Sequence, residues 1–342
     1  MLERLTNARG VSGDEGEIRA LLRDECQRLG LSTETDSLGT LYARKPKPGA
    51  KRVLLAAHMD EVGFLVTGAD NEGLLRYQTV GGIDPRVVVS KNVLIGKDRV
   101  PGVIGAKAIH LQSPEEMARV LPHKEMRIDI GAKDRGEAEK LCPPGTYAVF
   151  DSPLTPFGEG CVLGKALDDR VGCLALLAVL AKADLPVDLT CAFTVQEEVG
   201  LRGAQVAAQR LLPDLAIALE GTTCNDMGEV LTQEQVTSLG KGVVISFMDR
   251  ASIASPILYK IMTECAKEKG IPHQPKRGTS GGNDAGAMQR SFGGRPTITL
   301  SVPCRYIHSA NSVASLSDIQ AQQDLLLAFL RDFARYEGRI FA

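Results

Sequence analysis

The stretch 53-VLLAAHMDEVG-63 combines a strand pattern with polar side chains at its tip. Five apolar residues are followed at once by His58, and Asp60 and Glu61 come two and three positions later. Strands usually end in Gly, Asn or Pro, so an imidazole and two carboxylates here indicate that the strand carries chemistry at its end. The alternative is a solvated loop with one chance histidine, and partners elsewhere in the chain must decide between the two.

Length and composition are those of an ordinary globular protein. The chain has 342 residues, 44% of them hydrophobic and 24% charged, with a formal net charge of −2. It has no basic excess, polybasic run or tryptophan, so we expect neither nucleic acid nor a membrane as a partner. No apolar run approaches the ~20 residues of a membrane helix, and the first ten residues lack the apolar core of a signal peptide. The eight cysteines form no C-x-x-C pair, which predicts reduced thiols and a cytoplasmic protein.

The order of the expected elements predicts an α/β fold with a small β unit inserted into it. Long strands and helices alternate in the early and late parts of the chain, as in an α/β sheet. The middle part has short apolar runs separated by turn signals, which indicates an all-β unit. These runs are 64-FLVTG-68, 74-LLRYQTV-80, 87-VVVS-90, 92-NVLIG-96 and 100-VPGVIG-105. The predicted α/β domain therefore covers residues 1–63 and 160–342, and the predicted inserted domain covers residues 64–159.

One predicted helix start matters for the later argument. Ser12 precedes the helical pattern of 17-EIRALLRDECQRLG-30, and Glu15 lies three residues after Ser12. This spacing is typical of a capping box, in which the hydroxyl and the carboxylate each accept from a backbone N–H of the first turn. We therefore expect this pair to cap a helix that stops at Gly30.

Further polar side chains follow other expected strands or begin a helix. They are Glu197 and Glu198 after 188-DLTCAFTV-195, Glu220 after 215-LAIAL-219, His308 after 297-TITLSV-302, and Asp168 and Asp169 before a buried helix. Ligands of open α/β sheets bind beyond the carboxyl ends of the strands, so these groups can converge. Taken singly, each also has an ordinary explanation, namely a solvated turn, a helix cap or a buried core histidine.

Two histidines and at least four carboxylates suit zinc, cobalt or manganese. The lack of nearby cysteines argues against a closed structural zinc site. Ionised carboxylates a few ångströms apart repel one another, and two divalent ions compensate that repulsion better than one. The same reasoning predicts one carboxylate that bridges the ions and another that stays free to act as a base.

A series of ordered blocks over nearly the whole chain carries a family resemblance. The blocks are GVSGDE, AAHMDEVGF, PGVIGAKAIHL, DIGA, GKALDDRVGC, QEEVGLRGA, ALEGT, GGNDAGA and PCRYIHS. Together they resemble the tetrahedral (TET) dinuclear metalloaminopeptidases, which include glutamyl and deblocking aminopeptidases. The resemblance implies a three-layer zinc-peptidase-like domain interrupted by a PDZ-like β domain, which contributes to dimers and tetrahedral dodecamers. It also implies removal of N-terminal residues from short peptides by metal-activated water.

The resemblance implies the ligands of two divalent ions per subunit, zinc in the first place, with cobalt or manganese as alternatives. These ligands are His58, Asp168, Glu198, Glu220 and His308. His58 and Glu220 would bind one ion, Glu198 and His308 the other, and Asp168 would bridge the two. Many relatives have Asp where this chain has Glu220. We expect the longer side chain to affect metal affinity or identity more than mechanism.

The resemblance also implies roles beyond direct ligation. Glu197 would be the general base, and Asp60 would orient the neighbouring imidazole through its carboxylate. The peptide bond between Asp168 and Asp169 is expected to be cis. Asn283 departs from the threonine that relatives often have in the GGNDAGA block.

Other functions stay open at this point. One is an amidohydrolase or deacylase that acts on N-acyl amino acids with the same ions. Another is a non-catalytic assembly protein of the same fold, although such a protein needs no spare base such as Glu197. A glycosidase would use an acid pair but leave both histidines without a role. A carboxypeptidase would need a cation for the terminal carboxylate, and the arginines near the motifs are Arg170, Arg202, Arg250 and Arg305.

Overall fold

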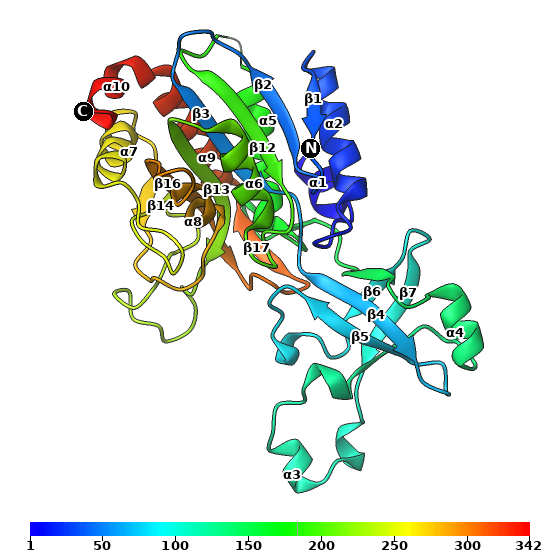
Figure 1. The fold of residues 1–342 in the computed structure, drawn as a ribbon. Helices are drawn as coiled ribbons and strands as arrows, with labels where there is room; N and C mark the ends of the chain where they lie inside the picture. The colour runs from blue at the N-terminus through cyan, green and yellow to red at the C-terminus, as the bar shows by residue number, and fades with distance from the viewer. Residues whose placement is uncertain (183) are drawn as a thin grey trace.

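The computed structural model describes residues 1–182 and 184–342, and a large mixed sheet forms its centre (Figure 1). Its strands are β1 (Thr33–Thr35), β2 (Leu41–Lys45), β3 (Arg52–His58), β10 (Thr155–Phe157), β11 (Cys161–Gly164), β12 (Asp188–Thr194), β13 (Leu215–Thr223), β14 (Val243–Ser246), β15 (His273–Pro275), β16 (Thr297–Arg305) and β17 (Ser312–Ser315). The main path runs β1-β2-β12-β3-β13-β16-β17-β11-β10, with β14 paired to β16 and β15.

The neighbouring strands β12, β3, β13 and β16 are parallel, whereas the pairs that flank them on the main path are antiparallel. Along β3, Val53 and Leu55 belong to one buried cluster, and Leu54 and Ala56 belong to another. A strand that is buried on both faces needs a nearly continuous apolar sequence, which VLLAA provides. Because the four strands are parallel neighbours, their carboxyl ends meet at one edge of the sheet.

Helices cover both faces of this sheet. They are α1 (Leu2–Asn7), α2 (Gly16–Arg28), α5 (Leu167–Leu180), α6 (Arg202–Leu211), α7 (Pro256–Glu268), α8 (Asp284–Gln289), α9 (Leu316–Arg331) and α10 (Phe333–Ile340). Helices α5, α7 and α9 contribute to one buried cluster, while α6 and α8 pack with the opposite face of the central strands. The predicted α/β class is confirmed. Among the residues that the structure describes, no helix has the length and apolarity to cross a bilayer.

A second, smaller unit is a closed antiparallel barrel between Gly63 and Phe150. Its strands are β4 (Gly63–Ala69), β5 (Leu75–Val80), β6 (Asn92–Ile95), β7 (Val100–Gly105), β8 (Arg127–Asp129) and β9 (Tyr147–Phe150). In its core, Phe64 packs edge-on against Tyr77 and Phe150, with ring centroids 5.1 Å apart in each pair. Closure removes free strand edges. Helix α3 (Pro114–Met117) lies at the end of this unit far from the large sheet, and α4 (Arg135–Leu141) lies on its side (Figure 1).

The prediction of a strand over 87–90 is wrong. The 3-10 helix η1 (Pro85–Val87) begins just before this run, and Val88 is buried in the barrel core. Pro85 fixes a helical φ angle at the first position of that turn. The Asp84 carboxylate accepts from the backbone N–H of Arg86 at 2.9 Å and caps the turn.

The predicted capping box at the second helix is also wrong. Helix α2 begins at Gly16, and its N-cap residue Glu15 makes no side-chain cap bond. The Glu15 carboxylate accepts instead from the backbone N–H of Gly13 at 2.8 Å. The Ser12 hydroxyl donates to a carboxylate oxygen of Asp60 at 2.6 Å. The Ser12 hydroxyl therefore donates to a charged carboxylate of a distant segment and does not cap the helix.

Candidate active site

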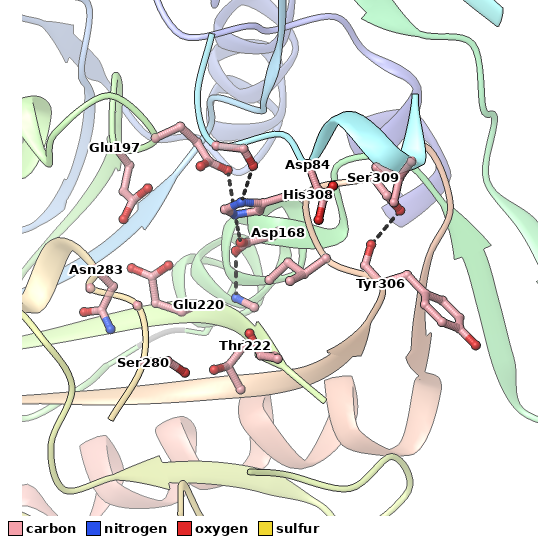
Figure 2. A pocket seen from close by; sticks show the side chains of 18 of the residues that line it. Asp84, Asp168, Glu197, Glu220, Thr222, Ser280, Asn283, Tyr306, His308 and Ser309 are labelled. Carbon is pink, nitrogen blue, oxygen red and sulfur yellow. Dashed lines mark hydrogen bonds and ion pairs between the residues drawn. The ribbon is translucent and has the colours of Figure 1, made fainter. Parts of the chain in front are cut away.

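Polar side chains gather where the parallel strands end (Figure 2). His58 is the last residue of β3, Glu220 lies in β13, and His308 follows β16. Glu197 and Glu198 come just after β12. These side chains line one cavity of ≈ 1160 Å³ together with the first turn of α5. The strand order β12-β3-β13-β16 explains the convergence, because each strand delivers its terminal residues beside those of its neighbour.

Asp168, in the first turn of α5, lies between the two histidines. Its Oδ1 is 3.4 Å from Nε2 of His58, and its Oδ2 is 3.5 Å from Nε2 of His308. The backbone N–H of Gly221 donates to the same Oδ1 at 3.1 Å. A Cβ at position 221 would lie 2.9 Å from that oxygen, so the close approach requires glycine. One carboxylate thus presents one oxygen to each imidazole.

Each histidine has a further carboxylate beside it. Oε2 of Glu220 lies 3.6 Å from Nε2 of His58, and Oε1 of Glu198 lies 3.4 Å from Nε2 of His308. The structure therefore brings together all five residues predicted as metal ligands. They form two groups that share Asp168.

Asp169 adds a buried carboxylate beneath the first group. The peptide bond between Asp168 and Asp169 is cis, as expected. Asp169 accepts hydrogen bonds from the backbone N–H of His58 at 3.2 Å and of Gly172 at 3.0 Å. Its carboxylate also lies close enough to His58 and Glu220 for the three donor atoms to fall within 4.8 Å of one another. Asp169 therefore fixes the end of β3 and the start of α5 relative to each other.

Both imidazoles turn Nε2 into the cavity because Nδ1 is engaged elsewhere. Nδ1 of His58 donates to the backbone carbonyl of Asp60 at 3.1 Å, and Nδ1 of His308 donates to that of Gly82 at 3.0 Å. A carbonyl only accepts, so the proton stays on Nδ1 and the Nε2 lone pair is available for a metal ion. Gly82 follows strand β5 of the barrel, so the smaller unit contributes directly to the site.

Asp60 acts on the acid pair more than on the imidazole. Its carboxylate lies 3.6 Å from Nδ1 of His58, beyond a normal hydrogen bond. The same carboxylate accepts from the backbone N–H groups of Glu197 at 3.1 Å and Glu198 at 3.2 Å. Ser12 donates to it as well, and Asp60 is fully buried. The predicted ring-orienting contact comes from the Asp60 backbone, and the carboxylate fixes the turn that carries both glutamates.

Glu197 lies at the cavity wall, and Figure 2 shows its carboxylate near that of Glu220. Burial is the largest of several effects on Glu197 and raises its pKa well above the usual range; the charge of His58 opposes this, and that of Glu198 reinforces it. A carboxyl group with a raised pKa can exchange a proton near neutral pH, as a general base must.

Three further acids of the site, Glu198, Asp284 and Glu220, also have raised pKa values. Burial raises the pKa of Glu198 to about 7 and that of Asp284 to about 6, and it raises the pKa of Glu220 well above its usual range. Within the described residues, Oε1 of Glu220 and Oδ1 of Asp284 are buried and accept no hydrogen bond. Buried acceptors without donors are costly, and a divalent cation would satisfy them. Imidazole and carboxylate donors in this arrangement fit divalent metal ions.

Ser12 and Asp284 belong to the site but were not predicted as site residues, although the blocks GVSGDE and GGNDAGA contain them. Ser12 holds Asp60, as described above. Asp284 begins α8 and accepts from the Thr194 hydroxyl at 2.5 Å. Asn283 caps the same helix by accepting from the backbone N–H of Ala285 at 3.0 Å. The side chain of Asn283 therefore serves as the N-cap of α8.

Three of the four arginines considered for a terminal carboxylate are engaged elsewhere. Arg170 is buried and donates to the backbone carbonyl of Ala8, and Arg305 pairs with Asp226. Arg202 donates to the Gln196 side chain. Arg250 is the member of the set that lines the cavity.

Comparisons with known proteins find relatives that match nearly the whole chain. The model of the M42 glutamyl aminopeptidase family matches residues 39–325. A putative aminopeptidase of Acetivibrio thermocellus is 38% identical over 330 residues, which cover 96% of each chain. An aminopeptidase from the archaeon Desulfurococcus kamchatkensis has a similar structure, with a TM-score of 0.94, 31% identity and coverage of 100% of this chain and 96% of that one.

A second similar structure is the TET1 peptidase of Pyrococcus horikoshii, which can assemble into a tetrahedron or a large octahedral shell. Its TM-score is 0.85, with 36% identity and coverage of 96% of this chain and 98% of that one. The fold, the site and these relatives define the class of this protein as a peptidase, a hydrolase of peptide bonds. The chain belongs to the M42 glutamyl aminopeptidase family, as the resemblance of its sequence blocks predicted.

Proposed function

We propose that this protein is an aminopeptidase that uses two divalent metal ions to remove N-terminal residues from short peptides. The arrangement around Asp168 carries the proposal, since its two oxygens lie 3.4 and 3.5 Å from Nε2 of the two histidines. His58 and Glu220 would hold one ion, His308 and Glu198 the other, and Asp168 would bridge them. Zinc is the first candidate, with cobalt or manganese as alternatives, because all three accept these donors.

When bound, the two ions would lower the pKa of a water molecule and polarise the scissile carbonyl. Glu197 would take the proton from the attacking water and deliver it to the leaving amine. Its raised pKa supports both transfers. Asp60 would keep this base in position by accepting the backbone N–H groups of Glu197 and Glu198.

Selection of the N-terminus would follow from the charge of the substrate. The acids of the cavity attract the protonated form of a free α-amine, and a bound metal ion would accept the lone pair of the neutral form. An N-acylated substrate has neither property. A deacylase of the same fold would accept that substrate, so the acyl group separates the two functions.

The finer architecture and the assembly belong to the same proposal. We assign the large sheet and its helices to a three-layer zinc-peptidase-like domain and the barrel from Gly63 to Phe150 to a PDZ-like inserted domain. The border expected at residue 159 moves to about residue 150 in this assignment, because β10 (Thr155–Phe157) pairs with β11 of the large sheet. We infer a homo-oligomer built from dimers and closing as a tetrahedral dodecamer. Solved structures of the TET1 relative, described as a dodecamer and as able to form a tetrahedron or a large octahedral shell, support such an assembly. All eight cysteines are free thiols in the described structure and seven are buried, which supports a cytoplasmic location.

The experiment that tests the function compares leucyl-p-nitroanilide with its N-acetylated form. Protein treated with a chelator is assayed before and after addition of Zn²⁺, Co²⁺ or Mn²⁺. We expect hydrolysis of the free-amine substrate alone, and only with metal. Equal hydrolysis of the acetylated substrate would favour a deacylase, and no hydrolysis by protein with bound metal would contradict the proposal.

A further inference from the structure

The segment 305–309, which carries His308, has a strained backbone. Tyr306 and His308 both have left-handed φ angles, 56° and 60°. Such conformations cost free energy in residues other than glycine, so surrounding contacts must hold them. Within the segment, the Ser309 hydroxyl donates to the backbone carbonyl of Tyr306 at 2.6 Å (Figure 2). The position of this histidine therefore depends on what anchors the segment from outside.

The two histidines of the site differ in how far strand pairing reaches. His58 is itself part of the parallel ladder, opposite Thr194 of β12. The pairings of β16 end at Arg305, which lies opposite Val313 of β17. His308 lies three positions beyond that end. Side-chain contacts must therefore do for His308 what the ladder does for His58.

Arg305 makes such a contact at the start of the segment. Its Nε donates to Oδ1 of Asp226 at 2.6 Å, and its guanidinium Nη2 donates to Oδ2 of the same carboxylate at 2.9 Å. Two parallel bonds between a guanidinium and a carboxylate fix orientation as well as distance. The Asp226 side chain is only 10% exposed, so solvent screens the pair only in part. The pair therefore fixes the chain three positions before His308.

Asp226 is held by its own loop as well as by Arg305. Its Oδ2 accepts from the backbone N–H of Leu239 at 2.9 Å, and its Oδ1 accepts from the Cys224 thiol at 3.1 Å. Burial raises the pKa of Asp226, but the hydrogen bonds from Arg305 and Cys224 outweigh this effect and lower the pKa to about 2. The carboxylate is therefore ionised at any pH at which hydrolysis would be assayed.

The loop 224–242, which carries Asp226 between β13 and β14, is anchored at its far end. Asp318, in the first turn of α9, accepts from the backbone N–H groups of Gly240 at 2.6 Å and Gly242 at 2.7 Å. The Asp318 side chain is fully buried. The loop therefore holds Asp226 on a support that is tied to a helix of the large domain.

We propose that the ion pair of Asp226 and Arg305 positions His308 for its metal ion. The inference rests on the proposed two-metal function and assigns a support to one of the two ions. Both are positioning residues, since in the described structure neither lines the active-site cavity. Without the pair, the segment 305–309 loses the contact that fixes its start, and Nε2 of His308 no longer stays beside Asp168. The ion at His58 keeps all of its ligands.

Asp226→Asn tests this inference because it removes the charge but keeps the shape of the side chain. Chelator-treated wild type and variant are titrated with Zn²⁺ against a competing chelator, which gives two dissociation constants. We expect the weaker ion to lose about 10- to 100-fold in affinity, as is typical when a group that orients a metal ligand is removed. The tighter ion should keep its affinity. Excess zinc should restore leucyl-p-nitroanilide hydrolysis in the variant.

Two further variants show whether the effect runs through the ion pair and through His308. Arg305→Met should weaken the same ion, and the double variant with Asp226→Asn should lose no more than the single variants, because both break one contact. In a His308→Ala background, Asp226→Asn should leave the affinity of the remaining ion unchanged. The matched control is Asp214→Asn, which breaks the ion pair with Arg52 at the opposite end of the central strands. It should change neither dissociation constant.

Several results would overturn the inference. They are an unchanged affinity for the weaker ion in Asp226→Asn, equal weakening of both ions, and additive losses in the double variant. Equal weakening would show general damage to the fold in place of a specific effect on His308. Failure of the wild type to bind two zinc ions, or to hydrolyse leucyl-p-nitroanilide when loaded, would contradict the proposed function instead.

Discussion

The two histidines of the site are held in different ways. The His58 side chain is 1% exposed, and its Nδ1 bond goes to Asp60, two residues along the same segment. The His308 side chain is 35% exposed, and its Nδ1 bond crosses to Gly82, next to the barrel. One half of the site is therefore built within the sheet, whereas the other depends on contact between the two parts of the molecule.

The difference predicts unequal metal binding. His58 and Glu220 are both buried and belong to paired strands, so their donors are fixed before an ion arrives. His308 has a left-handed backbone, φ 60°, in the segment after β16. A non-glycine residue in this region stores strain that surrounding contacts must hold. We therefore expect the His58 half to bind its ion more tightly than the His308 half.

The largest effect is expected from Asp168→Asn, because Asp168 belongs to both halves. An amide loses the negative charge and one acceptor oxygen, so both ions should be lost and hydrolysis should fall to background. Elemental analysis of the purified variant measures this. The control is Asp324→Asn, on the exposed face of α9. Two retained ions per subunit would contradict the bridging role.

Glu197→Gln should separate catalysis from metal binding. The amide cannot accept the proton of the attacking water, so kcat should fall by about 10²–10⁴-fold. Both ions should remain, because Glu197 belongs to neither group of ligands. Turnover near the wild-type rate would remove Glu197 from the role of base.

His58→Ala and His308→Ala compare the two halves directly. Titration with a chelator should show that His308→Ala keeps one ion with nearly native affinity, because the buried half stays intact. His58→Ala should weaken metal binding more, since it removes a buried donor beside the bridging carboxylate. Equal metal content in the two variants at every chelator concentration would contradict the comparison.

Ser12→Ala should have a smaller effect, expressed mainly in kcat. The variant removes a hydrogen bond to the ionised Asp60, and such bonds contribute about 1.5–3 kcal/mol. With roughly half of this stabilising the position of Glu197, kcat should fall by about 4- to 12-fold and KM should change little. Ser12→Thr, which keeps the hydroxyl, should restore most of the rate. A loss of thermal stability without a change in kcat would show that Ser12 supports the fold alone.

The smallest effect concerns the pH dependence of stability in the metal-free protein. Burial raises the pKa of Glu198 to about 7. Burial lowers the pKa of His308, but the hydrogen bond to Asp168 and the charge of Glu198 outweigh it and raise this pKa to about 9. Groups with a raised folded-state pKa stabilise the fold at low pH and lose that contribution as pH rises.

The melting temperature of the chelated protein should therefore fall between about pH 5 and 9. Metal ions take the place of the bound protons, so the metal-loaded protein should show a smaller decrease. Parallel melting curves for the two forms across this range would contradict the assignment of these residues as metal ligands.

The buried half of the site could be predicted because regular structure places it. His58 ends the apolar strand β3. Glu220 follows an apolar run in β13, which is the parallel neighbour of β3 in the sheet. Once the alternation of strands and helices is read as an α/β sheet, their carboxyl ends must meet at one edge. The positions of Glu197 and Asp168 follow from the same rule, at a strand end and a helix start.

The remaining contacts could not be predicted because packing between distant segments decides them. The spacing from Ser12 to Glu15 favours a local cap, and only the folded chain brings Asp60 to the hydroxyl. Gly82 reaches His308 across 226 positions of sequence.

The most direct test of the account is a zinc titration of chelator-treated wild-type protein, followed by leucyl-p-nitroanilide hydrolysis and elemental analysis. We expect no activity without metal and a rise that saturates at two ions per subunit. We also expect no hydrolysis of the N-acetylated substrate at any metal concentration. Full activity in the metal-free protein, or saturation at one ion per subunit, would contradict the two-metal site around Asp168.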